Sequence, residues 1–212
     1  MAPVNHNHRT QLPMAIVGAL LAWIAVILQF VLMLQNRAFP IPETLVRFFS
    51  YYTILTNLLV ACCFTALACK PVEAKPRFLA DPRMLAATAV YITVVGAVYN
   101  IILRHQWAPQ GLQLVVDELL HSVTPLYYLV FWVAFIPKTM LTWKHVFPWL
   151  LYPLIYFLCI LVRGALSGFY PYPFINVTEL GWGTVLLNSA GITVAFVVVS
   201  LVVIGISRFK RL

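Results

Sequence analysis

A small set of hydroxyl, imidazole and carboxylate side chains offers the chemistry of a covalent hydrolase. Asp117 and His121 are four residues apart, so on a helix they share one face. There the carboxylate can hold the imidazole in one tautomer and raise its basicity, and the imidazole can activate a nearby hydroxyl. We predict Thr53 as the nucleophile, with Thr56 and Ser50 as rivals, His121 as the base and Asp117 as its orienting residue. The alternative is that these hydroxyls bond to carbonyls of their own helix.

The same segment allows a metal site as a second interpretation. Glu118 and His121 are three residues apart, the spacing that two-metal helical bundles use for their Glu-x-x-His ligands. His105 and Glu179 could complete such a set. These bundles usually carry two such motifs, whereas this sequence has one. A metal-dependent hydrolase therefore stays an alternative, and we expect no metal or other cofactor.

Further polar residues are candidates for contact with a substrate. We expect Asn57 and Asn100 to act as oxyanion donors. The stretch from Tyr170 to Phe174 alternates aromatic residues with proline, and we interpret it as a lid over the polar cluster. An anchor at the membrane interface is the alternative for that stretch. The predicted substrate-binding residues are Asn57, Asn100, Glu118, Asn188, Arg163 and Tyr172.

The elements that must position these residues are membrane-spanning helices. Hydrophobic residues make up 62% of the 212 residues and charged residues 9%, with a mean hydropathy of +0.91, whereas soluble domains are about 25% charged. A spanning helix needs about 20 mostly apolar residues. We therefore predict one all-α domain over residues 1–212, a polytopic membrane bundle of six transmembrane helices. The spans are Leu12–Gln35, Phe48–Cys69, Met84–Arg104, Leu114–Ile136, His145–Arg163 and Trp182–Ser207.

The basic residues predict the orientation of this bundle. The net charge of +8 is interpreted as topology signals and contacts to anionic lipid, and not as nucleic-acid binding. Ten Lys and Arg lie on the side of the two termini and four on the other, which predicts cytoplasmic termini. The ten are Arg9, Lys70, Lys75, Arg77, Arg83, Lys138, Lys144, Arg208, Lys210 and Arg211.

With this orientation, nearly all polar residues of the spans lie in their outer halves. At 1.5 Å per residue, Thr53 is roughly 7 Å below the outer start of its span and His121 roughly 10 Å below the start of its own. Ionisable groups in a membrane are costly and usually functional, so we predict a polar pocket in the outer leaflet. The inner halves are almost purely apolar, which weighs against transport. A transporter, or a membrane protein that binds lipids or small molecules without catalysis, remains the competing class.

Several short motifs occur in an order that resembles a known family. They are SYYTILTN (50–57), VYN (98–100), LLHSVTPL (119–126), WLLYPL (149–154), RGA (163–165) and YPF (172–174). In these motifs the chain resembles a bacterial branch of the androgen-induced family of multi-pass membrane hydrolases. The resemblance implies hydrolysis of fatty acid esters of hydroxy fatty acids, with the family's threonine nucleophile at Thr53 and its histidine base at His121.

The chain departs from the animal pattern of that family near both motifs. Asp117 and Glu118 stand where an Asn and a His precede the key histidine, and Thr56 stands where the family has an acid. The resemblance further implies a multi-pass protein of the bacterial plasma (inner) membrane. Its expected partners are membrane lipids and a lipid-ester substrate, with no nucleic acid.

Overall fold

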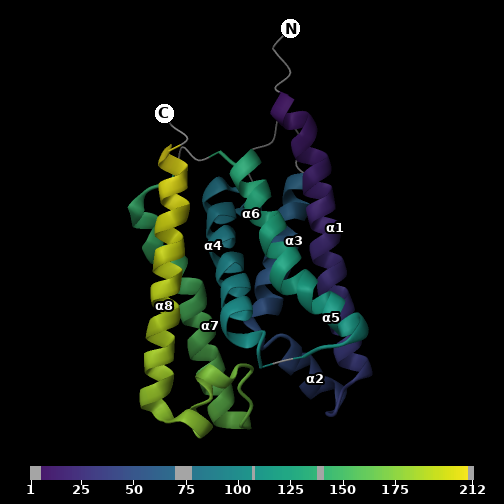
Figure 1. Ribbon diagram of the computed structural model, residues 1–212, viewed down its shortest axis with the longest axis vertical. Coiled ribbons are helices and arrows are strands. Elements are labelled where there is room, and N and C mark those ends of the chain that lie inside the picture. Colours follow the sequence, from purple (N-terminus) through teal and green to yellow (C-terminus); the bar gives the residue numbers. More distant parts are fainter. Residues whose placement is uncertain (1–5, 70–77, 107, 138–140, 210–212) are drawn as a thin grey trace.

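A computed structural model describes residues 6–69, 78–106, 108–137 and 141–209, and within these ranges the chain forms helices and no strand (Figure 1). The fold class predicted from the sequence, an all-α polytopic bundle, is confirmed. The α-helices are α1 (His6–Gln35), α2 (Ile41–Phe48), α3 (Tyr52–Ala68), α4 (Pro82–Val98), α5 (Gly111–Glu118), α6 (Thr124–Phe135), α7 (Val146–Ser167) and α8 (Val177–Phe209). Shorter helical turns are η1 (Phe78–Ala80), η2 (Tyr99–Leu103), η3 (Leu119–Val123), η4 (Trp143–His145) and η5 (Pro173–Ile175).

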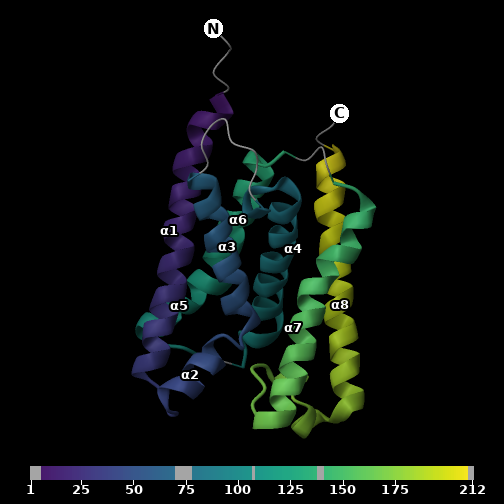
Figure 2. The ribbon, with the colours of Figure 1, turned by 180° about the vertical axis from the view of Figure 1, so that it is seen from behind.

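The helices cross the molecule in alternating directions. Five segments of the described chain are long and apolar enough to span a membrane, or six when the bent pair of α2 and α3 is counted as one span. The start of α1 and the end of α8 therefore lie at the same end of the bundle (Figures 1 and 2). The protein is an integral membrane protein, while the cytoplasmic location of that end stays a prediction. Six of the basic residues counted for it lie outside the described residues: Lys70, Lys75, Arg77, Lys138, Lys210 and Arg211.

The second predicted span differs from the structure at its start. We expected a continuous helix from Phe48 to Cys69, but α2 and α3 meet at a break and are bent by 71°. At the break Ser50 donates its hydroxyl to the carbonyl of Val46, and Tyr51 has an extended backbone (φ −84, ψ 124). The spanning part thus begins at Tyr52. Thr53 consequently lies in the first turn of α3 and not several residues inside a span.

The half of the bundle nearest the termini is a closely packed apolar core. Its centre is the fully buried ring of Phe64, which packs edge-on against Tyr128 and Phe131 at centroid distances of 5.1 and 5.0 Å. The same ring lies over Gly18, where an added Cβ would come within 2.6 Å of it. This contact fixes α1, α3 and α6 against one another. Because α3 and α6 continue into the other half, it also fixes the elements that carry Thr53 and His121.

Candidate active site

Thr53, His121 and Asp117 come together at the end of the bundle opposite the termini. Thr53 Oγ1 lies 3.3 Å from His121 Nε2. The other ring nitrogen, Nδ1, lies 2.9 Å from the main-chain carbonyl of Asp117 and 3.3 Å from its carboxylate. Both partners of Nδ1 are acceptors, so Nδ1 carries the proton and Nε2 is free to accept one from the threonine.

Of the three hydroxyls considered from the sequence, Thr53 is the one in contact with His121. Ser50 donates to its own helix at the carbonyl of Val46, as the alternative interpretation expected. Thr56 lies 3.4 Å from the hydroxyl of Tyr152, one turn deeper along α3. The geometry therefore favours Thr53 as the nucleophile.

Tyr99 holds both members of the histidine–carboxylate pair. Its ring stacks on the imidazole of His121 at a centroid distance of 3.9 Å and an interplanar angle of 13°. Its hydroxyl donates to the second carboxylate oxygen of Asp117. One side chain thus fixes the plane of the ring and the direction of the carboxylate. From the sequence Tyr99 was predicted only as part of the VYN motif. Its place next to Asn100, a predicted site residue, was the signal that could have identified it.

His121 projects from a π-helical turn, η3. Pro125 follows this turn and explains why the α-helical hydrogen bonds are interrupted there. Proline has no N–H, so it cannot donate to His121 in an α-helical register or to Leu120 in a π-helical one. Thr124 N–H donates to Leu119, five residues back. The carbonyls of Leu120 and His121 therefore need donors from elsewhere, because a buried carbonyl without a partner is costly.

Asn57 and Asn100 supply those donors. The amide of Asn57 donates to Leu120 O at 3.2 Å and to Thr53 O at 2.9 Å. The amide of Asn100 donates to His121 O at 3.2 Å and to Gly96 O at 2.8 Å. Since an amide has two hydrogens, neither residue has one left for an oxyanion. Their contacts position the backbone around Thr53 and His121 instead, so the geometry does not support the predicted oxyanion role.

A second π-helical turn, η2, faces the first and carries Tyr99 and Asn100. Within it Arg104 N–H donates to the carbonyl of Tyr99 at 2.8 Å, five residues back. Just before η2, α4 approaches η3 closely at Gly96, where an added Cβ would lie 3.1 Å from the carbonyl of His121. Paired π-turns of this kind widen each helix locally and are frequent at functional sites.

Tyr172 reaches the site from the loop between α7 and α8. Its hydroxyl oxygen accepts the main-chain N–H of Thr53 at 3.2 Å and lies 3.4 Å from Thr53 Oγ1. Burial raises the pKa of Tyr172 to about 12, so the phenol keeps its proton at neutral pH. The predicted lid therefore covers the cluster through this residue. Asn188 holds the lid from α8 by donating to the carbonyl of Phe174 at 2.9 Å.

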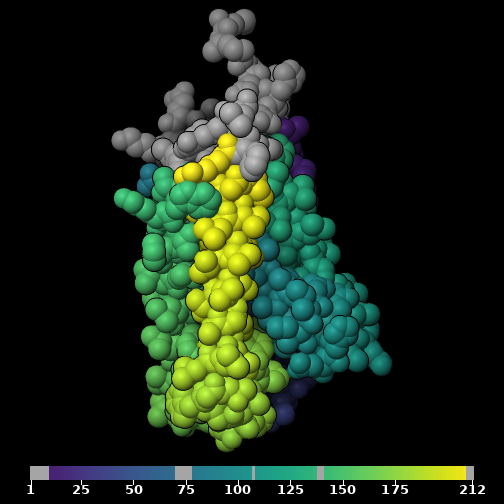
Figure 3. Space-filling view, turned by 60° about the vertical axis from the view of Figure 1, so that its left-hand side comes forward, coloured from purple at the N-terminus to yellow at the C-terminus, as the bar shows by residue number. Residues whose placement is uncertain are grey.

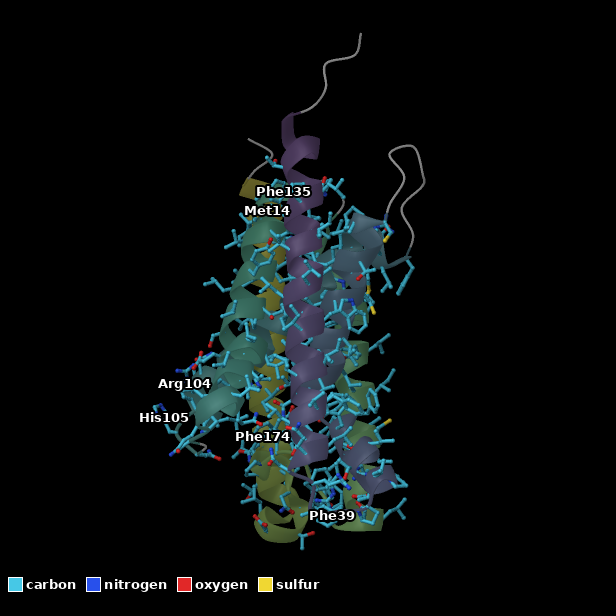
Figure 4. All side chains as sticks on the ribbon, turned by 90° about the vertical axis from the view of Figure 1, so that its right-hand side faces the viewer. Met14, Phe39, Arg104, His105, Phe135 and Phe174 are labelled. Atoms are coloured by element: carbon cyan, nitrogen blue, oxygen red, sulfur yellow. The ribbon has the colours of Figure 1, made fainter. Side chains whose placement is uncertain are left out.

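The remaining predicted residues lie away from Thr53. Glu118 pairs with Arg104 at the outer surface, and Arg163 pairs with Glu43 at 3.1 Å. Figure 4 shows Arg104 and His105 projecting from the side of the bundle, well away from Phe174. Within the described ranges no three His, Cys, Asp or Glu residues are grouped to hold a metal, so the metal alternative gains no support.

A charged and aromatic cluster that was not predicted from the sequence holds α2 against α7. Glu43 binds Arg47 at 2.7 Å as well as Arg163. The guanidinium of Arg47 lies between the rings of Phe39 and Phe169, 3.6 and 4.2 Å from their centroids. The spacing of Glu43 and Arg47, four residues apart, was the available signal.

Two cavities meet at Thr53. A polar one of about 610 Å³ contains Asp117, His121 and Arg47 in its lining. An apolar one of about 360 Å³ lies between α4, α7 and α8. Of the predicted substrate-binding residues, Tyr172 lines these cavities, whereas the other five do not. The residues common to both linings are Thr53, Tyr99, Leu103 and Tyr172.

Comparison with known proteins gives no match: no family model, no curated protein and no solved structure is significantly similar to this chain.

Proposed function

We propose that this protein is an intramembrane lipid-ester hydrolase with Thr53 as nucleophile and His121 as general base. The observation that carries the proposal is the 3.3 Å contact between Thr53 Oγ1 and His121 Nε2, with Nδ1 of the same ring held by Asp117. This order of hydroxyl, imidazole and carboxylate is the arrangement that activates a nucleophile in covalent hydrolysis.

In the proposed reaction Thr53 Oγ1 attacks the ester carbonyl and passes its proton to His121 Nε2. The carbonyl–oxygen bond to the alcohol then breaks, and His121 returns the proton to the departing alcohol. Water, activated by the same imidazole, attacks the acyl-threonine and releases the carboxylic acid. Threonine and histidine thereby return to their starting protonation states.

Two features near Thr53 can stabilise the negative charge that develops on the carbonyl oxygen. The break before α3 places Thr53 at a helix N-terminus, where the helix dipole favours negative charge. The protonated hydroxyl of Tyr172 lies beside Thr53 Oγ1 and can donate a hydrogen bond to the carbonyl oxygen of the bound ester. Tyr172 takes the role that the sequence analysis gave to Asn57 and Asn100.

The membrane setting and the resemblance to the androgen-induced family support a lipid substrate. Thr53 and His121 occupy the positions that the resemblance implies for the nucleophile and the base. The proposed location is the bacterial inner membrane, and fatty acid esters of hydroxy fatty acids are the proposed substrates. The proposal needs no cofactor.

A fluorophosphonate probe tests the proposal directly, because it labels activated hydroxyl nucleophiles. Purified protein should label and should hydrolyse p-nitrophenyl butyrate, and both activities should be lost in Thr53→Ala and in His121→Ala. Thr56→Ala is the matched control, since it removes a buried hydroxyl one turn away and should keep both activities. Unchanged labelling and turnover in both active-site variants would overturn the proposal and favour a non-enzymatic lipid-binding or transport protein.

A further inference from the structure

We propose that the apolar cavity between α4, α7 and α8 is the acyl-chain subsite of this enzyme, and that the chain enters it sideways from the membrane. This inference rests on the proposed hydrolase function and specifies which of the two cavities holds the acyl half of the ester and which holds the alcohol half. The alcohol half, the attacking water and the released alcohol would then use the polar cavity.

The lining of the apolar cavity suits a hydrocarbon chain. None of the described residues that line it carries a charge, and its walls are mainly aliphatic and aromatic. Val94 and Val98 come from α4, Phe157 from α7 and Phe196 from α8. Methylene groups make favourable van der Waals contacts with such a surface, whereas a hydrated alcohol or carboxylate would lose its hydrogen-bond partners there.

The nucleophile lies at the mouth of this cavity. Thr53 and Tyr172 line both cavities, while His121 and Asp117 line only the polar one. An ester carbonyl at Thr53 therefore has an apolar space on one side and the base on the other. This arrangement directs the acyl chain into the apolar cavity and leaves the departing oxygen near His121, which must return a proton to it.

The cavity reaches the face of the bundle that contacts lipid. Leu154 on α7 is 50% exposed and Ala190 and Thr193 on α8 are also exposed, although all three line the cavity. Figure 3 shows α8, in yellow, on this face, with the green residues of α7 on one side and teal residues from the middle of the chain on the other. On α8 the cavity is lined by the small residues Ser189, Ala190 and Thr193 beside Ile192 and Phe196.

An aromatic layer closes the inner end of the cavity. The ring of Tyr91 lies 4.8 Å from that of Tyr152 and 6.4 Å from that of Phe196, one turn beyond Val94 on α4. Between Val94 in α4 and Leu103 in η2 the lining extends about 13 Å along the helix axis. The cavity is thus a slot with a floor, which limits the length of chain that fits.

The test compares ester hydrolysis with a short and a long acyl chain. The measured quantity is the ratio of kcat/KM for p-nitrophenyl palmitate to that for p-nitrophenyl butyrate, in purified protein in detergent micelles. In Ala190→Trp the ratio should fall at least about tenfold, because an indole in the slot keeps the long chain from placing its carbonyl at Thr53, and a small misplacement of the reacting atoms can cost about 100-fold. Leu187→Trp is the matched control: Leu187 is on the same helix and 73% exposed, does not line the cavity, and should leave the ratio unchanged.

Other variants place the chain in one cavity or the other. Phe196→Ala opens the floor and should raise the ratio. Met33 lines only the polar cavity, so Met33→Trp should leave the ratio unchanged. An unchanged ratio in Ala190→Trp and Phe196→Ala, or a falling ratio in Met33→Trp, would overturn the subsite assignment. If Thr53→Ala hydrolyses neither ester and the ratios are still those that contradict the subsite, only the subsite assignment is overturned. If Thr53→Ala keeps full activity, the hydrolase function itself is overturned.

A crosslinking measurement does not depend on turnover. A palmitoyl ester with a diazirine near the end of its acyl chain, irradiated with Thr53→Ala protein, should attach to peptides of α4 and α8 around Val94 and Phe196. Attachment mainly to α1 and α2, which border the polar cavity, would contradict the proposal.

Discussion

Replacement of Asp117 by asparagine distinguishes two ways in which His121, the proposed base, can be held in one tautomer. In the serine-protease triad the same change lowers kcat about 10⁴-fold, because the histidine adopts the wrong tautomer. Here the nearer acceptor of His121 Nδ1 is the main-chain carbonyl of Asp117 at 2.9 Å, and the carboxylate lies at 3.3 Å. The substitution keeps that carbonyl, so the tautomer should be preserved.

The expected loss in Asp117→Asn is therefore electrostatic only. The asparagine can still accept from Nδ1 with its oxygen and can donate its amide to Tyr99, so the geometry is retained. What disappears is the negative charge that stabilises the imidazolium formed during attack. We expect kcat to fall about 10- to 100-fold, which corresponds to about 1.4 to 2.7 kcal/mol in the barrier.

The assay is steady-state hydrolysis of p-nitrophenyl butyrate, with the thermal midpoint of unfolding measured beside it. Tyr99→Phe is the companion variant, because it removes the hydroxyl that orients the carboxylate but keeps the ring stacked on His121. It should lose less activity than Asp117→Asn. A loss near 10⁴-fold in Asp117→Asn would refute the reasoning, since it would mean that the carboxylate and not the carbonyl sets the tautomer. Full activity would refute the role of the charge.

Three further predictions concern the support of the site. Asn57→Ala leaves the buried carbonyls of Thr53 and Leu120 without their side-chain donor and should destabilise the protein by about 2 to 4 kcal/mol. The loss should appear as a lower thermal midpoint of unfolding in detergent, and an unchanged midpoint would contradict this prediction. Tyr172→Phe should lower kcat about 100-fold with little change in KM, and an equal rise in KM would instead indicate a role in substrate binding. Pro125→Ala restores an N–H donor for η3 and should lower turnover up to about 100-fold by displacing His121. The thermal midpoint of unfolding should stay the same or rise. A lower midpoint with normal turnover would contradict the role given to Pro125 in the π-turn.

The arrangement of spans and the meeting of Thr53 with His121 could be predicted because both depend on hydropathy and helical spacing. Long apolar runs locate the helices, and their alternation places Thr53 and Asp117 at the same end. The depth estimate was less accurate. Thr53 lies in the first turn of α3, whereas His121 lies ten residues into its helical segment; the two meet because α5 slopes across the lower end of the bundle (Figure 1).

The support of the site could not be predicted because it depends on backbone irregularities. The break before α3 occurs at Ser50 and Tyr51, with no proline or glycine to signal it. The role of Asn57 follows from a carbonyl that is free only because Pro125, in another helix, lacks an N–H. Such a partnership joins two residues across the bundle, and no local pattern reveals it.

The placement of Tyr172 has a consequence for the biosynthesis of the protein. Thr53, Asp117 and His121 belong to the second and fourth membrane segments, so they can assemble while the ribosome is still translating the chain. Tyr172 follows the fifth segment, and its loop is held by Asn188 in the sixth. A chain released before α8 would therefore contain both Thr53 and His121, the proposed nucleophile and base, but would lack both the anchor of Tyr172 and one wall of the apolar cavity. The last helix to be synthesised completes the site. An unfinished chain would therefore have the reactive side chains but not the cavity proposed to select the substrate.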